Sequence, residues 1–395
     1  EMRQRYEEDG IIAIRGLIDT DLLDRIVSEA ESMVESQRQK NYIKTKERPK
    51  VLTGKPPQPK QFFMTQQGVV FGSFNDYGVQ ANNETQQSNT TNGYTDDNDR
   101  HEDVKPVSSK DNSAFLQVAM MSKIPKVASI LLGLEDDSSC TNETVRLMRD
   151  IFLAKDEEEY ICGFHVDDVG FWPALANATG VNAWVALDDM PVSNGGGFAV
   201  AVGSHRASWK NDAYTITGST HRYPDGGFQS SRDILQNRPG NGTCNIESSA
   251  PHLHRRMEET MRVYDVKRGD VIFHTRWLFH RTIAFDRSLV EQQKISGKPE
   301  SIVYKRYSIR YSPGSAVIPP GYGVEPSVLS NKANGGRTAD EVSQEDAPWY
   351  PKVWPSVDDT ELREMEILAQ ERFPNAMAKA DDRRRIIRPR KSRQH

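Results

Sequence analysis

Phe164-His165-Val166-Asp167-Asp168-Val169-Gly170-Phe171-Trp172-Pro173 is the most informative stretch of this chain, because it places an imidazole and a carboxylate two residues apart. In an extended strand, side chains at i and i+2 point to the same face. His165 and Asp167 can therefore be two ligands of one metal ion. A second imidazole from elsewhere in the chain would complete a set of two His and one carboxylate. Such a set binds iron and leaves positions open for a cosubstrate and oxygen.

The composition is that of a folded chain with long polar segments. Of the 395 residues, 36% are hydrophobic, and the mean hydropathy is −0.68. We find no apolar window of about 18 residues, so we expect no membrane-spanning helix. The net charge of −5 gives no reason to expect nucleic acid as a partner. The basic run in residues 383–395 is interpreted as a solvated tail rather than a polyanion-binding one.

Cysteines and glycosylation motifs say little about the compartment, which stays open. Three scattered cysteines are too few for a disulfide framework or a Cys-rich zinc site: Cys140, Cys162 and Cys244. Five Asn-x-Ser/Thr triplets point toward a secretory route, although they also arise by chance in polar loops: Asn83, Asn89, Asn142, Asn177 and Asn241. The sequence starts at Glu1 without an initiator Met, so we expect any targeting peptide to lie outside the printed chain.

Hydrophobic periodicity predicts helices early in the chain and strands in its middle. A short apolar run at 11–14 precedes a helix whose apolar stripe runs from Leu22 to Val34. Helical spacing returns at 114–132, interrupted at Pro125 and ended by Gly133. Alternation then predicts strands at 145–155, 181–187, 197–202, 261–266, 270–274 and 302–311. Short strands between turns indicate an antiparallel sandwich or barrel.

We predict a single domain over residues 1–395. Its parts are a helical support (1–135), a β core (145–312) and a C-terminal extension (313–395) with one helix at 358–373. The polar segments 82–105 and 206–259 are interpreted as loops, with the option of closing over a pocket. His252-x-His254, inside the second segment, is expected to be exposed rather than a second metal pair.

A second motif lies downstream, in Arg268-Gly269-Asp270-Val271-Ile272-Phe273-His274-Thr275-Arg276-Trp277-Leu278-Phe279-His280-Arg281-Thr282. A Gly-Asp turn leads into an apolar strand and, after a short loop, a His. Taken with the first motif, Trp184 and the turns at 194–197 and 203–205, this ordered series resembles the phytanoyl-CoA dioxygenase family of Fe(II)- and 2-oxoglutarate-dependent oxygenases. The resemblance implies a mainly β fold with flanking α: a double-stranded β-helix (cupin-like jelly roll) with helices on one sheet.

The resemblance implies that His165, Asp167 and His280 are the metal ligands and form the catalytic centre. The family's metal His is followed by a small hydroxyl-containing pair, which Arg281-Thr282 fits better than the residues after His274. His274 is then a strand residue near the site, and its exchange with His280 stays open.

The resemblance also places Lys155, Trp184 and Thr282 around 2-oxoglutarate. The distal carboxylate of that cosubstrate needs an Arg, because a planar guanidinium binds it with two hydrogen bonds. Residues 286–301 look like an insertion, so the aligned position is Arg306. Arg310 shares its face by strand parity and remains the alternative.

The implied reaction uses Fe(II), 2-oxoglutarate and O2 and releases succinate and CO2. It oxidises an unactivated C–H bond of a small or medium-sized organic substrate, by hydroxylation, desaturation or oxidative cyclisation. Related halogenases have a small residue at the carboxylate position, so Asp167 argues against chlorination. Asp168, Phe171, Trp172 and Arg276 flank the ligands as candidate substrate contacts, although the aromatic ones fit a core equally well.

Two other functional classes are alternatives to an oxygenase. A non-catalytic jelly-roll binding protein would have a broken ligand set or lack the carboxylate anchor, and neither is seen. A structural or hydrolytic zinc site with the same ligands would leave Lys155, Trp184 and Arg306 without a role. The oligomeric state is open, with a monomer favoured.

Overall fold

The computed structural model describes residues 2–47, 64–67, 114–134, 143–156, 163–166, 172, 174, 178–206, 208–209, 246–295, 303–318, 335–345 and 350–355. Several expectations lie outside these residues. They are the loop at 82–105, the helix at 358–373, the basic tail, the three cysteines and the asparagines of the five Asn-x-Ser/Thr triplets.

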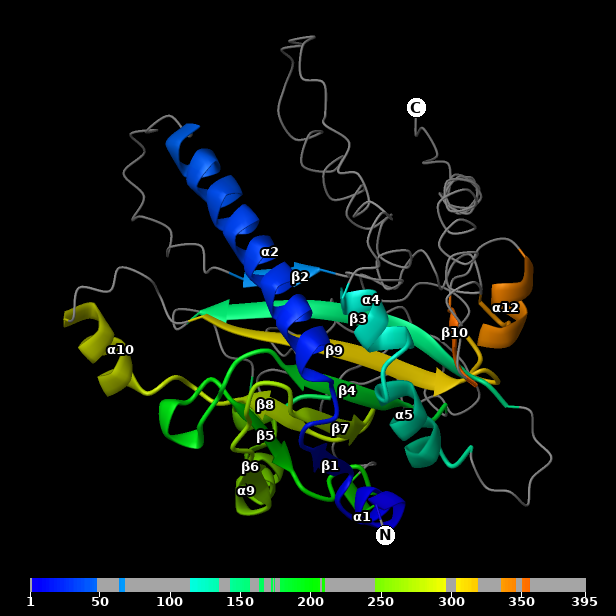
Figure 1. The fold of residues 1–395 in the computed structure, drawn as a ribbon. Helices are drawn as coiled ribbons and strands as arrows, with labels where there is room; N and C mark the ends of the chain where they lie inside the picture. The colour runs from blue at the N-terminus through cyan, green and yellow to red at the C-terminus, as the bar shows by residue number, and fades with distance from the viewer. Residues whose placement is uncertain are drawn as a thin grey trace, which may run out of the picture.

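Two antiparallel sheets form the centre of the fold (Figure 1). The larger sheet has the order β1-β7-β4-β9-β3-β10, with β2 also paired to β3, and the smaller has the order β6-β5-β8. The strands are β1 (Ile11–Ile14), β2 (Met64–Gln67), β3 (Val145–Asp156), β4 (Val181–Ala186), β5 (Phe198–Ala201), β6 (Met261–Val263), β7 (Val271–Thr275), β8 (His280–Thr282), β9 (Val303–Pro313) and β10 (Lys352–Trp354). Side chains from both sheets share one buried cluster, so the sheets face each other. The predicted jelly roll is confirmed.

Strand β4 shows how the larger sheet divides two environments, because all of its residues are buried. Val181, Ala183 and Val185 belong to the cluster that packs under the helices. Trp184 and Ala186 belong to the cluster between the two sheets. The outer face of the larger sheet therefore packs against the helices and forms a core with them. Its inner face lines the space between the two sheets.

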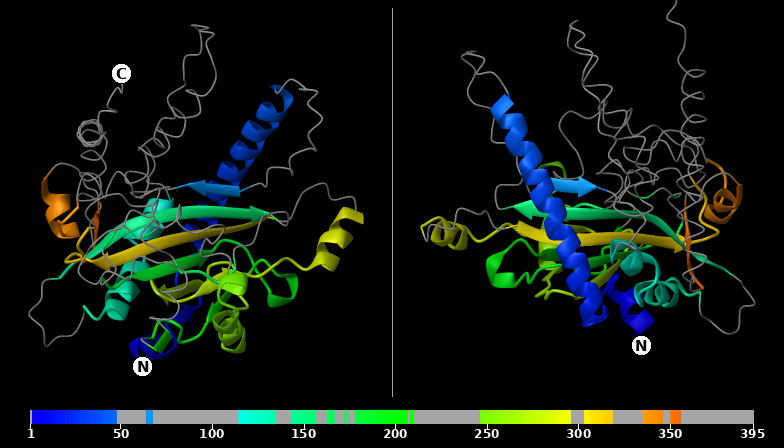
Figure 2. Two further views of the ribbon diagram at one scale, coloured as in Figure 1. Left: turned by 180° about the vertical axis from the view of Figure 1, so that it is seen from behind. Right: turned by 45° about the horizontal axis from the view of Figure 1, so that its top comes forward.

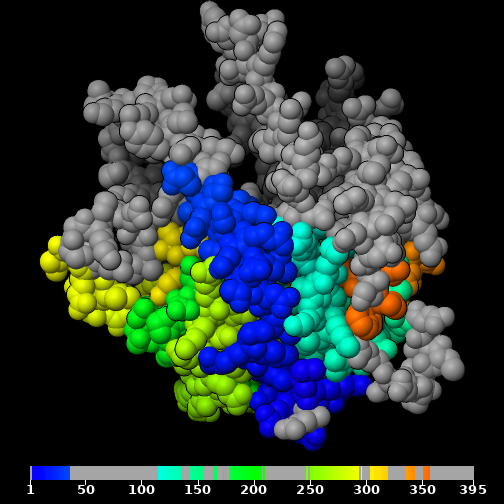
Figure 3. Space-filling model, viewed as in Figure 1, coloured from blue at the N-terminus to red at the C-terminus, as the bar shows by residue number. Residues whose placement is uncertain are grey.

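Helices α1 (Met2–Asp9), α2 (Thr20–Glu47), α4 (Ala114–Met120) and α5 (Ile124–Leu132) cover the outer face (Figures 1 and 2). Figure 3 shows the blue N-terminal residues and the cyan residues of α4 and α5 side by side on this surface. Helix α5 carries Pro125 in its first turn and ends at Gly133, whose φ of 78° is a left-handed conformation that glycine adopts without strain. The predicted break and end are confirmed.

The expectation that the chain has no apolar window of about 18 residues was wrong for residues 114–132. They form a stretch long and apolar enough, by composition, to cross a membrane, so such a window does exist. In the structure, however, the stretch is two helices, and most of its residues are buried against α2 and the sheet. Its apolar character is accounted for by core packing.

Two strands were missed in the sequence, and one segment was misread. β2 pairs with β3 although its four residues are mostly polar, and β10 brings the C-terminal extension into the larger sheet. The last part of the 206–259 segment is helical, with α8 (Ile246–Ser249) and α9 (Pro251–Glu259). The interpretation of this part as a loop was therefore wrong, because Leu253 and Met257 bury one side of α9.

The proposed insertion at 286–301 contains helix α10 (Arg287–Ile295). Asp286 starts this helix, and its carboxylate accepts hydrogen bonds from the backbone of Ser288 (2.8 Å) and Leu289 (3.2 Å). Hydrogen bonding by Ser288, together with these amides, lowers the pKa of the Asp286 carboxyl. The insertion therefore forms a capped surface helix between β8 and β9.

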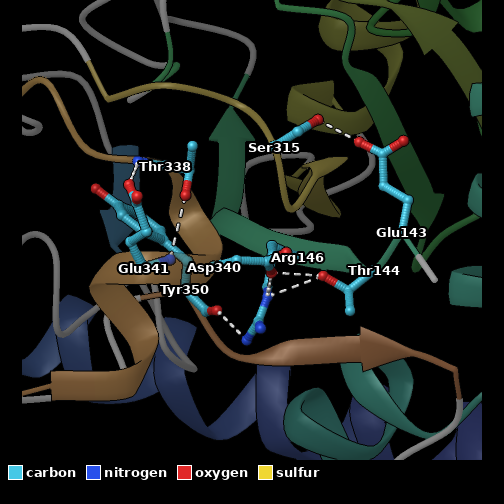
Figure 4. A network of polar contacts seen from close by, with 8 residues as sticks. All are labelled: Glu143, Thr144, Arg146, Ser315, Thr338, Asp340, Glu341 and Tyr350. Atoms are coloured by element: carbon cyan, nitrogen blue, oxygen red, sulfur yellow. Dashed lines mark hydrogen bonds and ion pairs between the residues drawn. The ribbon is translucent and has the colours of Figure 1, made fainter. Parts of the chain in front are cut away.

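A polar network anchors the C-terminal segment to β3 (Figure 4). Arg146 donates from Nε to Asp340 Oδ1 (2.6 Å) and from Nη1 to the Tyr350 carbonyl (3.2 Å), while Thr144 donates to the same Asp340 oxygen (2.6 Å). Thr338 and Glu341 cap helix α12 (Ala339–Glu345) reciprocally, with N···O distances of 2.7 and 3.2 Å. Residues at the start of β3 therefore hold the Asp340 carboxylate of the C-terminal extension.

We expect Arg146→Met to lower the free energy of unfolding by about 1–3 kcal/mol, because the partly buried Asp340 carboxylate loses a charge-assisted donor. Urea denaturation measures this change. Lys123→Met is the matched control, since Lys123 and Asp19 are paired at 3.6 Å with side chains 66% and 79% exposed. That control should change stability by less than about 0.5 kcal/mol. Equal effects of the two variants would contradict a structural role for the network.

Candidate metal and cosubstrate site

His165 and His280 are brought together by the backbone. The two residues exchange hydrogen bonds, from His165 N to the His280 carbonyl (3.0 Å) and from His280 N to the His165 carbonyl (2.9 Å). Their ring centroids are 4.4 Å apart. Two imidazoles bound side by side to one metal ion, each with its nitrogen about 2.1 Å from the metal, would have centroids roughly 4.5 Å apart. The pair therefore has the spacing of two ligands of one ion.

Both rings are also held in the tautomer that a metal requires. His165 Nδ1 lies 2.9 Å from the Gly163 carbonyl, and His280 Nδ1 lies 3.0 Å from the Leu278 carbonyl. A carbonyl oxygen can only accept, so each Nδ1 carries the proton and each Nε2 carries the lone pair. This is the arrangement in which proteins usually present imidazole to a metal.

The third predicted ligand, Asp167, lies outside the described residues, as do Asp168 and Phe171. Within the part of the chain that the structure describes, no group of three His, Cys, Asp or Glu side chains could hold a metal ion. The two imidazoles would need a further ligand from elsewhere, and Asp167 follows His165 by two residues. Its role stays a prediction.

A third imidazole, His274 on β7, lies beside the pair. Its ring centroid is 4.9 Å from that of His280, and its Nδ1 lies 3.1 Å from the Thr275 carbonyl. The expectation that His274 is a strand residue near the site is confirmed. The backbone pairing that joins the two motifs is made by His280, which supports His280 as the ligand.

Phe198 was missed in the sequence, although it forms the wall behind the histidines. Its ring is 5.4 Å from His280, with an interplanar angle of 26°, and also 5.4 Å from His274 and from Trp184. It lies directly opposite Thr282 in the β5–β8 register. The only local signal for Phe198 in the sequence was its place as an apolar residue at the start of a strand, directly after the 194–197 turn.

Arg281 and Glu258 form a second feature that was missed. Arg281 Nη1 and Nη2 lie 2.6 and 3.1 Å from the two oxygens of Glu258, and its guanidinium is 4.5 Å from the centre of the Phe164 ring. Helix α9 is thereby fixed to β8 and to the residue before His165. His254 is partly buried and lies 3.2 Å from Glu258, so the prediction of exposure holds for His252 but was wrong for His254.

Arg306, Thr282 and Trp184 lie together on the inner side of the larger sheet. Arg306 Nη2 donates to Thr282 Oγ1 at 3.4 Å, and its guanidinium is 5.8 Å from the Trp184 ring. Arg306 is 7% exposed. Lys155 pairs with Tyr304 in the β3–β9 register, and its side chain is outside the description. Three of the four predicted cosubstrate residues therefore converge.

Arg310 shares the inner face with Arg306, as strand parity predicted, but has other neighbours. Its register partners are Asn182 on β4 and Arg149 on β3. Four residues of strand separate Arg310 from Arg306, roughly 13 Å. The two arginines therefore belong to different parts of the face.

Trp172 and Arg276 are buried beside this face. Trp172 is fully buried and donates from Nε1 to Ser312 Oγ at 3.2 Å. A Cβ on Gly180 would lie 2.1 Å from its ring, so only glycine fits beneath it. Arg276 donates to the Ala174 carbonyl at 2.8 Å and lies 4.4 Å from the Trp277 ring. These contacts give both residues a packing role, while substrate contact stays a prediction.

This geometry defines a class of protein: a jelly roll with two neighbouring histidines, each with its Nδ1 hydrogen-bonded to a backbone carbonyl, and a buried Arg306. The family model described as phytanoyl-CoA dioxygenase (PhyH) matches residues 6–285, more than half of the chain. The chain therefore belongs to the phytanoyl-CoA dioxygenase family. It is a non-haem iron, 2-oxoglutarate-dependent oxygenase, and its cofactors are Fe(II), 2-oxoglutarate and O2.

Three solved structures illustrate the similarity of the fold. The 2-oxoglutarate-dependent carbocyclase SnoK from nogalamycin biosynthesis is 16% identical, with a TM-score of 0.46 and coverage of 89% of this chain and 95% of that one. The epimerase SnoN in complex with Fe3+, 2-oxoglutarate and nogalamycin RO is 17% identical (TM-score 0.40; coverage 81% and 85%). HygX from Streptomyces hygroscopicus with nickel and 2-oxoglutarate bound is 14% identical (TM-score 0.37; coverage 85% and 95%). A search of the curated proteins gives no match.

We expect Phe198→Leu to weaken metal binding several-fold, because the His280 ring loses the surface that orients it. The same change should cost about 1–2 kcal/mol of stability. Phe115→Leu is the control, since Phe115 is equally buried but packs with the helices on the outer face. Anaerobic Fe(II) titration and urea denaturation should show both variants destabilised, and only Phe198→Leu with weakened metal binding. Equal metal affinity in the two variants would remove Phe198 from the site.

Proposed function

We propose that this oxygenase oxidises an unactivated C–H bond of a small or medium-sized organic substrate, with His165, Asp167 and His280 as the iron ligands. The observation that carries the proposal is the His165–His280 pair, whose rings are 4.4 Å apart and each fixed by a carbonyl. Thr282, two residues after His280 on β8, links this pair to Arg306 and Trp184 on the facing sheet.

In the hydroxylation case, the iron supplies the redox chemistry by which R–H, O2 and 2-oxoglutarate become R–OH, succinate and CO2. One oxygen atom of O2 enters succinate and the other enters the alcohol, so atoms and electrons balance. Desaturation or oxidative cyclisation removes two hydrogen atoms from the substrate instead, and the second oxygen atom leaves as water.

The chain's own residues hold the cosubstrate. Arg306 would hold the distal carboxylate, because a guanidinium can donate two parallel hydrogen bonds, and Thr282, whose Oγ1 is 3.4 Å from Arg306 Nη2, would add a hydroxyl donor beside it. Trp184 is 4% exposed and forms the apolar wall that excludes water. Burial strengthens the charge-assisted bonds, because the surroundings have a low effective dielectric constant.

Asp167 bears on the outcome of the reaction. Related halogenases have a small residue at this position, where chloride can bind, and a carboxylate here would hold the iron instead. The chain is therefore set up for oxygenation, desaturation or cyclisation rather than chlorination.

The iron and cosubstrate assignment has a direct spectroscopic test. Under anaerobic, reducing conditions, Fe(II) and 2-oxoglutarate should give the visible charge-transfer band of a chelated iron complex. His165→Ala and Asp167→Ala should each lose most of the band, since each removes one of three ligands. Absence of a band in the unaltered protein would reject the proposal.

The carboxylate anchor is tested by a pair of variants. Arg306→Gln should raise the Kd of 2-oxoglutarate by about 10–100-fold, because a buried charge-assisted contact is worth about 1.5–3 kcal/mol. Arg310→Gln, on the same strand and face, should leave this Kd within about threefold. Both values come from titrating the charge-transfer band. The reverse pattern would make Arg310 the anchor.

A further inference from the structure

The peptide group between Leu278 and Phe279 connects the His280 ring to a serine in a distant turn. Its carbonyl, that of Leu278, lies 3.0 Å from His280 Nδ1, and its N–H, that of Phe279, donates to Ser204 Oγ at 2.9 Å. We propose that Ser204 is a positioning residue, which acts through this peptide group to fix the orientation of the His280 ring and its strength as a metal ligand. The inference rests on the proposed function, because it takes His280 as a ligand of the iron.

The two hydrogen bonds act on opposite sides of one rigid unit. A peptide group is planar, and in its trans form the N–H and the C=O point in opposite directions. A peptide group that is held at its N–H therefore has its carbonyl oxygen held as well. That oxygen accepts from Nδ1 of His280, so the direction of the ring is set by a chain of two hydrogen bonds that starts at the Ser204 hydroxyl.

This chain of hydrogen bonds is buried along its whole length. Ser204 and Phe279 are each 1% exposed, Leu278 is fully buried and His280 is 8% exposed. In buried surroundings a hydrogen bond is stronger than in water, and a bond donated by the N–H of a peptide polarises its carbonyl into a better acceptor. A better acceptor at Nδ1 makes Nε2, the other ring nitrogen, a more basic metal ligand. Ser204 therefore acts on the electronics of His280 as well as on its orientation.

The residue before His280 has both of its backbone polar groups bound by the turn that contains Ser204. The N–H of Phe279 donates to Ser204 Oγ, and the carbonyl of Phe279 accepts from the N–H of Ala201 at 2.9 Å. Within the turn, the N–H of Ser204 donates to the Ala201 carbonyl at 3.1 Å. A displacement of this turn would therefore displace the peptide group that holds the His280 ring.

Helix α1 holds the turn from its other side. Its last carbonyls have no partner inside the helix, as at every helix end, and they accept from the turn instead. The three bonds run from Gly203 N to Asp9 O (3.0 Å), from His205 Nε2 to Glu7 O (3.0 Å) and from Arg206 Nε to Glu8 O (3.1 Å). The 203–205 turn, which the sequence marked without a role, thus links the N-terminal helix to the segment that carries His280.

Removing the hydroxyl tests the proposal. In metal-free Ser204→Ala, the His280 ring should no longer keep one tautomer, so its ring nitrogen chemical shifts should move toward the average of the two tautomers. The His280 signals are assigned by their absence in His280→Gln. In anaerobic Fe(II) titrations, the Kd of Ser204→Ala should rise about 3–10-fold. This effect is smaller than the loss of a direct partner of a metal ligand, which costs about 10–100-fold, because Ser204 acts through one intervening peptide group.

Ser312→Ala is the matched control. Ser312 is also buried, and its Oγ accepts from Trp172 Nε1 at 3.2 Å, so this change likewise deprives a buried N–H of its acceptor. Both variants should unfold at lower urea concentrations. Ser312→Ala, however, should keep the His280 tautomer and an Fe(II) Kd within about twofold of the unaltered protein.

A conservative variant adds a graded test. Ser204→Cys keeps the size of the side chain and a weak acceptor, so it should lie between the unaltered protein and Ser204→Ala in both the tautomer and the Fe(II) affinity. It also replaces Ser204→Ala if that variant does not fold.

Two results would overturn the proposal. One is an unchanged His280 tautomer and Fe(II) affinity in the Ser204 variants. The other is an equal loss in Ser204→Ala and Ser312→Ala, which would make the role of Ser204 purely structural. Failure of the unaltered protein to bind Fe(II) would instead reject the iron assignment, while the tautomer of metal-free His280 would still report whether Ser204 orients the ring.

Discussion

The site depends on one pair of backbone hydrogen bonds, those exchanged by His165 and His280. More than a hundred residues separate these positions, and each ring takes its orientation from a carbonyl two residues before it in its own segment. Because the main chain fixes both rings, a metal ion bound as proposed would not have to order them. A preorganised pair of this kind keeps the entropic cost of metal binding low. Phe198 and the Arg281–Glu258 ion pair then support the two segments from behind.

Much of this arrangement follows from local patterns. Alternation along Lys305–Tyr311 was enough to place Arg306 and Arg310 on one face, because strand periodicity admits only two faces. Pro125 and Gly133 marked the start and end of a helix through their backbone requirements alone. His274 was placed on a strand beside the site by the apolar run that contains it. These are cases in which a few neighbouring residues determine the outcome.

Other features could not be found in this way, because they depend on contacts between distant segments. β2 and β10 are short, and their sequences carry no strand signal strong enough to outweigh their polar surroundings; pairing with β3 decides them. Helix α9 lies in a polar region, and two buried residues suffice to dock it. Phe198 and Glu258 gain their importance from His280 and Arg281, which are far away in the sequence. Parity treats Arg306 and Arg310 alike, and their different neighbours become visible only with the adjacent strands in place.

The outermost strands of the larger sheet come from the segments that flank the β core, β1 on one side, and β2 and β10 along β3 on the other. An uncovered sheet edge presents unpaired N–H and C=O groups that recruit other chains. The flanking N-terminal and C-terminal strands therefore cover edges of the β core that would otherwise pair with other chains. These covering strands are short, which limits pairing of their own free edges with another chain. It follows that residues 145–312, although they contain most of the strands and both histidines of the site, are not an autonomous unit. Self-association would be the expected behaviour of that fragment alone.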